Sequence, residues 1–195
     1  MSKPDPASSR KNKQNTAIWV LTIFIVTIFV SALISLVSEE LLAGSGLVFA
    51  FVILLLIVLL GIVFDIIGVA VTSADEAPFH AMAARKVPGA KEAIRLLRKA
   101  DKVSSICNDV IGDICGVISG SAAATIAVQL LETFEFSWER LASLIMSAMI
   151  AGITVGGKAL GKSFAVNSST GIVHAVGKVI AWFSNLPQLF KKKKS

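Results

Sequence analysis

Four stretches of the chain are apolar over lengths that match the thickness of a lipid bilayer. A helix needs about 20 mainly apolar residues to cross a hydrocarbon core of roughly 30 Å. With 54% hydrophobic residues, the chain is also more apolar than an ordinary soluble domain. We therefore expect an all-α integral membrane protein with one membrane domain, residues 16–163, containing four transmembrane helices. The expected spans are residues 16–37, 46–72, 104–131 and 141–161.

Lysine and arginine are distributed unevenly over the connections between these spans. Eighteen of the nineteen basic residues lie in the N-terminal tail, in residues 85–102, or from Lys158 onward. Because basic residues concentrate in cytoplasmic connections, we expect both termini to be cytoplasmic and the protein to be a multi-pass protein of the plasma membrane. This asymmetry explains the net charge of +6, because basic residues on one side attract the anionic headgroups of the lipid bilayer. No nucleic-acid partner is expected.

The segments outside the spans have distinct expected structures. Residues 1–15 are polar and basic, which predicts a disordered N-terminal tail. Residues 77–102 predict a cytoplasmic helical hairpin, whose second helix turns Ile94 and Leu97 toward the membrane. Apolar residues at helical spacing predict a C-terminal amphipathic helix at 168–186 along the inner leaflet. Pro187 is expected to end that helix, and residues 187–195 to form a polybasic tail.

Polar side chains interrupt the second and third spans. A carboxylate on a lipid-facing helix costs ~2.5 kcal/mol or more, so such groups normally face a bundle interior, a partner or a water-filled path. Asp109 and Asp113 are one helical turn apart, and their repulsion predicts a nearby cation or protonation of at least one carboxyl. Hard divalent cations prefer such oxygen ligands. The candidate metal ligands are Asp65, Ser73, Asn108, Asp109 and Asp113.

Simpler roles remain open for several of these residues. Asp65 lies near a membrane end and could reach local water, and Ser73 could belong to a helix-capping signal with Asp75 and Glu76. His80 and His174 are expected to be surface residues rather than ligands. The two cysteines are expected to be small buried hydrophobes rather than a disulfide or metal pair.

Small residues recur every four positions in the third and fourth spans. This spacing puts them on one helix face and allows another backbone to approach closely. We expect these two spans to pack on each other and, because they are the less hydrophobic ones, to form the inner pair. The residues are Gly112, Gly116 and Gly120 in the third span and Ala148, Gly152 and Gly156 in the fourth.

The order of elements resembles the transmembrane domain of the CNNM/CorB (CorC-like) magnesium-transporter family, without its CBS domains. The likeness covers residues 54–189. It rests on Ser73-Ala74-Asp75-Glu76-Ala77, on the basic hairpin from Arg85 to Leu97, and on Gly157-Lys158-Ala159-Leu160-Gly161-Lys162. The resemblance implies a dehydrated Mg²⁺ held between three helices, with Ser73, Asn108, Asp109 and Asp113 matching the family's ligands in position or character. Lys158 stands where the family has a glutamate.

Two functions follow from these observations. The first is membrane transport of divalent cations, with Mg²⁺ as the expected bound or transported ion, Co²⁺ as an alternative, and a homodimer as the expected assembly. The second is a non-transporting membrane scaffold or subunit in which Lys158 forms an internal salt bridge with Asp109 or Asp113. No nucleotide-binding loop, soft-metal cluster or nucleophile with a base is found in the sequence, so we do not expect an enzyme.

Overall fold

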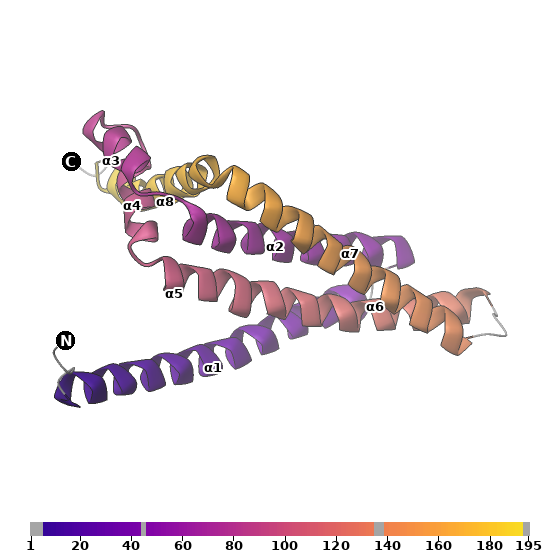
Figure 1. Ribbon diagram of the computed structural model, residues 1–195. Coiled ribbons are helices and arrows are strands. Elements are labelled where there is room, and N and C mark those ends of the chain that lie inside the picture. Colours follow the sequence, from indigo (N-terminus) through magenta and orange to yellow (C-terminus); the bar gives the residue numbers. More distant parts are fainter. Residues whose placement is uncertain (1–5, 44–45, 135–138, 193–195) are drawn as a thin grey trace.

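The computed structural model describes residues 6–43, 46–134 and 139–192, and within them the architecture is all-helical, as predicted (Figure 1). A π-helical segment, labelled η1, links a short helix to the third long one without a break. The elements are α1 Pro6–Ala43, α2 Leu47–Ser73, α3 Ala77–Ala84, α4 Ala90–Leu97, α5 Ala100–Ser105, η1 Ile106–Gly112, α6 Asp113–Phe134, α7 Glu139–Asn167 and α8 Ser169–Lys192.

Four of these helical stretches are long and apolar enough to cross a membrane. They are Thr16–Ser38, Leu47–Ser73, Ala100–Leu130 and Ser143–Asn167, in agreement with the four predicted segments. In Figure 1 the first turns of α1, the short helices α3 and α4, and α8 all lie at the same end of the bundle. A chain that crosses a membrane four times has both of its ends, and the connection between its second and third spans, on the same side. The side of the membrane that this end faces remains a prediction.

Helix α2 is the central element, because it contacts α7, α6, η1 and α5 along its length. Its first half forms an apolar core with α6, made of Ala50, Leu54, Val58, Ala122, Ala123 and Ile126. Helix α1 packs against the third span around Val110, Ile114 and Ile118, a cluster that Ile57 of α2 also joins. The most apolar window of α1 has no buried residue, so α1 is peripheral.

The third span is the inner one, as predicted, but the fourth is not. In the most apolar window of the third span 56% of residues are buried, against 11% in the fourth. The lower hydropathy of the fourth span comes in part from hydroxyl residues that bond within their own helix. Thr154, for example, donates its Oγ1 hydrogen bond to the Ile150 carbonyl at 2.8 Å. Such a bond satisfies the hydroxyl without a partner from another helix, and for this reason moderate hydropathy did not indicate burial.

Helices α6 and α7 are in contact, as predicted, but not through the glycines expected to join them. A Cβ atom added at Gly116, Gly120, Gly152 or Gly156 would meet no atom within 4 Å. The close approaches are made to α2 instead. A Cβ at Gly112 would lie 2.5 Å from Asp65 Oδ1, and one at Gly157 would lie 2.5 Å from Ile62 Cδ1.

The helices α3, α4 and α8 form a collar around the end of α2. Its buried core contains Val71, Phe79, Ala93, Leu97 and Val173. Gly177 of α8 lies directly against the Gly89 carbonyl, and Gly89 has a φ of 85°, which favours glycine. The expectation that Ile94 and Leu97 face the membrane is therefore wrong. Their face of α4 is covered by α8 and α2, which provide a protein surface for it.

Both terminal predictions need correction. Residues 6–15, expected as a disordered tail, are the start of α1, since a proline is readily accepted in the first helical turn. At the other end, α8 continues past Pro187 to Lys192. A proline removes one backbone donor and strains the preceding turn, but in a helix anchored by its packed first half this does not end the helix. Residues 1–5 and 193–195 lie outside the described part.

Candidate functional site

The side chain of Lys158, on α7, reaches between two carboxylates from other helices. Its Nζ lies 3.6 Å from Asp65 Oδ2 on α2 and 3.7 Å from Asp113 Oδ1 at the start of α6. The same ammonium donates a hydrogen bond to the Gly112 carbonyl at 3.1 Å. Three oxygen atoms, one each from α2, η1 and α6, therefore lie near the Lys158 ammonium. We call Asp65, Gly112, Asp113 and Lys158 the lysine cluster.

Close packing of α7 on α2 brings Lys158 to this position. Gly157 and Gly161, on either side of Lys158, lie against the side chains of Ile62 and Ile66 on α2. A Cβ at Gly161 would be 2.8 Å from Ile66 Cγ1. Because a side chain at either glycine would push the helices apart, this pair of glycines sets the distance from Lys158 to α2.

The third span contributes Gly112 and Asp113 at the point where the π-helix changes to an α-helix. Within this turn the Asp113 amide bonds to the Asn108 carbonyl, five residues earlier. Asp65 Oδ1 lies so close to Gly112 that a Cβ there would be 2.5 Å from it. Single-turn π segments of this kind often occur at functional sites. Here the wide turn and the absent side chain admit the Asp65 carboxylate beside the backbone.

The two carboxylates of the lysine cluster have different surroundings. The Asp65 side chain is 5% exposed and that of Lys158 is 19% exposed, whereas that of Asp113 is 73% exposed. Asp65 and Lys158 thus form the buried part of the cluster. With both carboxyls ionised, one ammonium and two carboxylates leave a net charge of −1. Asp113 carries that remaining charge at the outer edge of the helix bundle.

Asn108 lies one turn before Gly112 but outside the cluster. Its Nδ2 donates to the Ser104 hydroxyl at 3.1 Å. Its Oδ1 is buried and has no hydrogen-bond partner within the described chain, where it contacts Gly68 of α2. A buried carbonyl oxygen without a donor is costly and is uncommon in native structures. This oxygen is the least satisfied polar atom near the cluster.

The structure brings together only part of the predicted metal site. Asp65 and Asp113 meet at Lys158, but Asp109 and Ser73 are exposed. Within residues 6–43, 46–134 and 139–192 no group of three or more His, Cys, Asp or Glu side chains is placed to hold a metal ion. Glu76, part of the possible capping signal, pairs instead with His80 at 3.2 Å. The five candidate metal ligands remain predictions.

Sequence reasoning proposed a pairing of Lys158 with Asp109 or Asp113 and missed Asp65 as a partner. The missed signal is the pair of glycines around Lys158, since close packing at Gly157 and Gly161 favours contact with the most apolar helix. Asp65 is the only charged residue in that helix.

Comparison with known protein families, characterised proteins and solved structures finds no match to this chain.

Proposed function

We propose that the protein is a non-transporting membrane scaffold subunit, in which the ammonium of Lys158 occupies the polar site between the helices. The observation that supports this is the position of the Lys158 ammonium, within 3.7 Å of two carboxylates and hydrogen-bonded to the Gly112 carbonyl. A charge in the membrane interior normally requires a partner. In this cluster each buried charge has one from the chain itself.

The lysine cluster acts in the scaffold as a three-way connection. It joins α2, α7 and the junction of η1 with α6, the elements that form the centre of the bundle. An ammonium occupies the space between the carboxylates, and a metal ion placed there would be repelled by it at short range. Under this proposal the cluster holds the helices in register. The collar, whose exposed residues include Lys91, Arg95 and Lys178, is the part of the protein that contacts the membrane surface or another subunit.

Divalent-cation transport is the second candidate, and one observation favours it. The ammonium of Lys158 is shared by two carboxyl groups, of which that of Asp113 is exposed, and the nearby Asn108 Oδ1 lacks a donor within the described residues. Such oxygens are ligands for a hard cation such as Mg²⁺ or Co²⁺. For this function Lys158 would have to leave the cluster when the cation binds. The long, flexible lysine side chain, which is 19% exposed, is compatible with that movement.

Substitution of Lys158 in the full-length protein separates the two functions. Lys162 is the matched control, because it lies one turn later on α7, is exposed, and has no ion pair within the described residues. Lys158→Met, Lys158→Glu and Lys162→Met are compared with the original protein in two assays. One is the free energy of unfolding in mixed detergent micelles, and the other is Mg²⁺ uptake into proteoliposomes.

The scaffold function predicts a loss of about 3 kcal/mol in unfolding free energy for Lys158→Met, because Asp65 is left buried and unpaired. Lys158→Glu should be worse, Lys162→Met should change little, and the original protein should not take up Mg²⁺. The transport function predicts Mg²⁺ uptake by the original protein and unchanged or increased uptake by Lys158→Glu. Uptake above that of protein-free liposomes would refute the scaffold proposal.

A further inference from the structure

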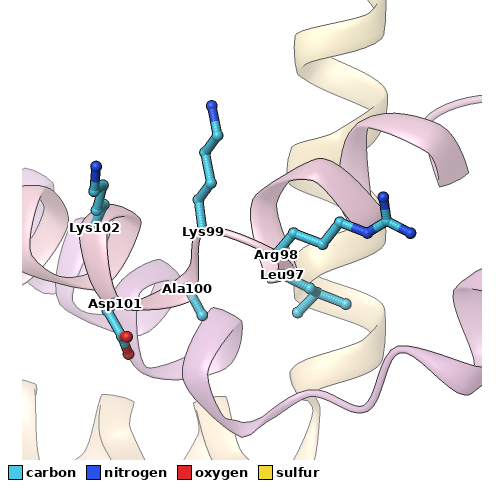
Figure 2. A pocket seen from close by; sticks show the side chains of 6 residues that line it. All are labelled: Leu97, Arg98, Lys99, Ala100, Asp101 and Lys102. Carbon is cyan, nitrogen blue, oxygen red and sulfur yellow. The ribbon is translucent and has the colours of Figure 1, made fainter. Parts of the chain in front are cut away.

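A second polar feature lies where α4 ends and α5 begins, ten or more positions before Gly112 of the lysine cluster. It is a hollow of about 430 Å³ (Figure 2). The backbone changes direction there, because Lys99 leaves the helical conformation with a φ of −122° and a ψ of 28°. The lining residues are Leu97, Arg98, Lys99, Ala100, Asp101 and Lys102.

The hollow has an excess of positive charge. Three of its six lining residues are basic and one is acidic. Figure 2 shows the side chains of Lys99 and Lys102 extending on the same side of the segment, whereas the Asp101 carboxylate points to the opposite side. Neither lysine has a carboxylate within ion-pair distance in the described part of the chain. Two ammonium groups on one side are thus available to an anion.

One aromatic contact indicates the depth of this hollow in the membrane. The Nζ of Lys102 lies 4.8 Å from the ring centroid of Trp19, a distance typical of a cation–π interaction. Trp19 is near the start of the span Thr16–Ser38, and Lys102 is near the start of the span Ala100–Leu130. Tryptophan is enriched at the boundary between lipid and water. The contact therefore indicates that the hollow is at the depth of the lipid headgroups.

We propose that this hollow binds the phosphate headgroup of one anionic phospholipid. Lys99 and Lys102 would contact the phosphate oxygens, with the ammonium of Lys102 held in position by Trp19. Leu97 and Ala100 provide an apolar lining for the carbon atoms next to the headgroup. This site differs from general attraction between basic residues and the membrane, because it requires two particular lysines. It does not depend on the function of the lysine cluster.

The test is lipid binding by the full-length protein, measured by native mass spectrometry in detergent. The protein is titrated with phosphatidylglycerol and, separately, with phosphatidylcholine. The test variant is Lys99→Gln/Lys102→Gln. The matched control is Lys91→Gln/Lys162→Gln, which removes the same charge from two exposed lysines that do not line the hollow. A further titration adds millimolar inorganic phosphate as a competitor.

Each lysine near an anionic headgroup contributes a factor of about five in affinity, so the test variant should bind phosphatidylglycerol about 30-fold more weakly. The control variant should retain the original affinity within about threefold, as expected for charges outside the site. Equal weakening in both variants would show general attraction and refute the site. Displacement of the lipid by millimolar phosphate would assign the hollow to a soluble anion and refute the lipid proposal.

Discussion

Asp65 and Asp113 contact the same ammonium from different helices, but only one of them is inside the protein. The Asp65 side chain is 5% exposed and packs against Gly112, whereas that of Asp113 is 73% exposed at the outer edge of α6. The inner carboxylate depends on Lys158 for its charge balance. The outer one lies within the third span, where an exposed carboxylate requires a partner or a water-filled path. An aspartate that faces the interior of the bundle therefore has a different role from one that faces outward.

The glycines make the same distinction. Gly68, Gly112, Gly157 and Gly161 face α2 or lie on it, and each would clash there if it carried a side chain. Gly116, Gly120, Gly152 and Gly156 face open space. A glycine in a helix costs roughly 0.5–1 kcal/mol relative to alanine, and close packing offsets this cost only in the first group. The comparison between inner and outer residues can therefore be tested by matched substitutions.

The largest difference is expected between Asp65→Asn and Asp113→Asn. Removal of the inner carboxylate leaves Lys158 partly buried with only its exposed partner, at a cost of about 3 kcal/mol in the free energy of unfolding. Loss of the outer carboxylate should cost less than this, because Lys158 keeps its buried partner Asp65 and its hydrogen bond to the Gly112 carbonyl. Unfolding of the two variants in mixed detergent micelles measures both values.

A double-variant cycle tests the origin of this difference. If the loss comes from the ion pair, Asp65→Asn combined with Lys158→Met should cost less than the sum of the two single changes. Additive losses would mean that Asp65 acts through packing with Gly112 rather than through its charge. Equal losses for Asp65→Asn and Asp113→Asn would contradict the distinction between inner and outer carboxylates.

A somewhat smaller difference is expected between Gly112→Ala and Gly116→Ala, one turn apart on the third span. The added Cβ at Gly112 would be 2.5 Å from Asp65 Oδ1 and 3.2 Å from the Cys107 carbonyl. Displacement of that carboxylate should cost about 1–3 kcal/mol, as overpacking does in other cores. Gly116→Ala should be neutral or stabilising by up to about 1 kcal/mol, because alanine is the better helix former.

Unfolding measurements on both glycine variants, each also combined with Asp65→Ala, show whether the carboxylate is the obstacle. With Asp65 shortened, most of the cost of Gly112→Ala should disappear, whereas Gly116→Ala should behave as before. A stable Gly112→Ala protein with Asp65 intact would contradict the close contact between α2 and the third span.

The helical class and the four long apolar stretches were predictable from the sequence because bilayer thickness fixes the length of an apolar helix. The contacts between helices were less predictable. Glycine spacing in α6 and α7 indicated which faces could approach another backbone, but the same spacing is compatible with an open face. The partner of Gly157 and Gly161 depends on the rotation of α7 about its axis, which a four-residue repeat alone does not determine.

The charged residues of the candidate site could be predicted from the sequence, but the contacts between them could not. Asp65 and Asp113 were noted because carboxylates in apolar segments are costly, and Lys158 because it stands where the resembled family has a glutamate. Asp65 and Lys158 are 93 positions apart in the chain, and no local pattern pairs them. Asp109 and Asp113 looked like the closer pair, but the π-helical turn alters the α-helical spacing between them. The wider turn could not be read from the residues.

The smallest expected effect concerns two serines that make the same hydrogen bond on different sides of α6. Ser119 is buried and donates to the Gly116 carbonyl, and Ser121 is exposed and donates to the Ile118 carbonyl, both at 3.0 Å. Because each bond is within one helix, Ser→Ala at either position should cost no more than about 1 kcal/mol. Ser→Val should separate them, since the buried position has no room for extra atoms and the exposed one does. Equal tolerance of valine at Ser119 and Ser121, in the same unfolding assay, would mean that the buried side of α6 is not tightly packed.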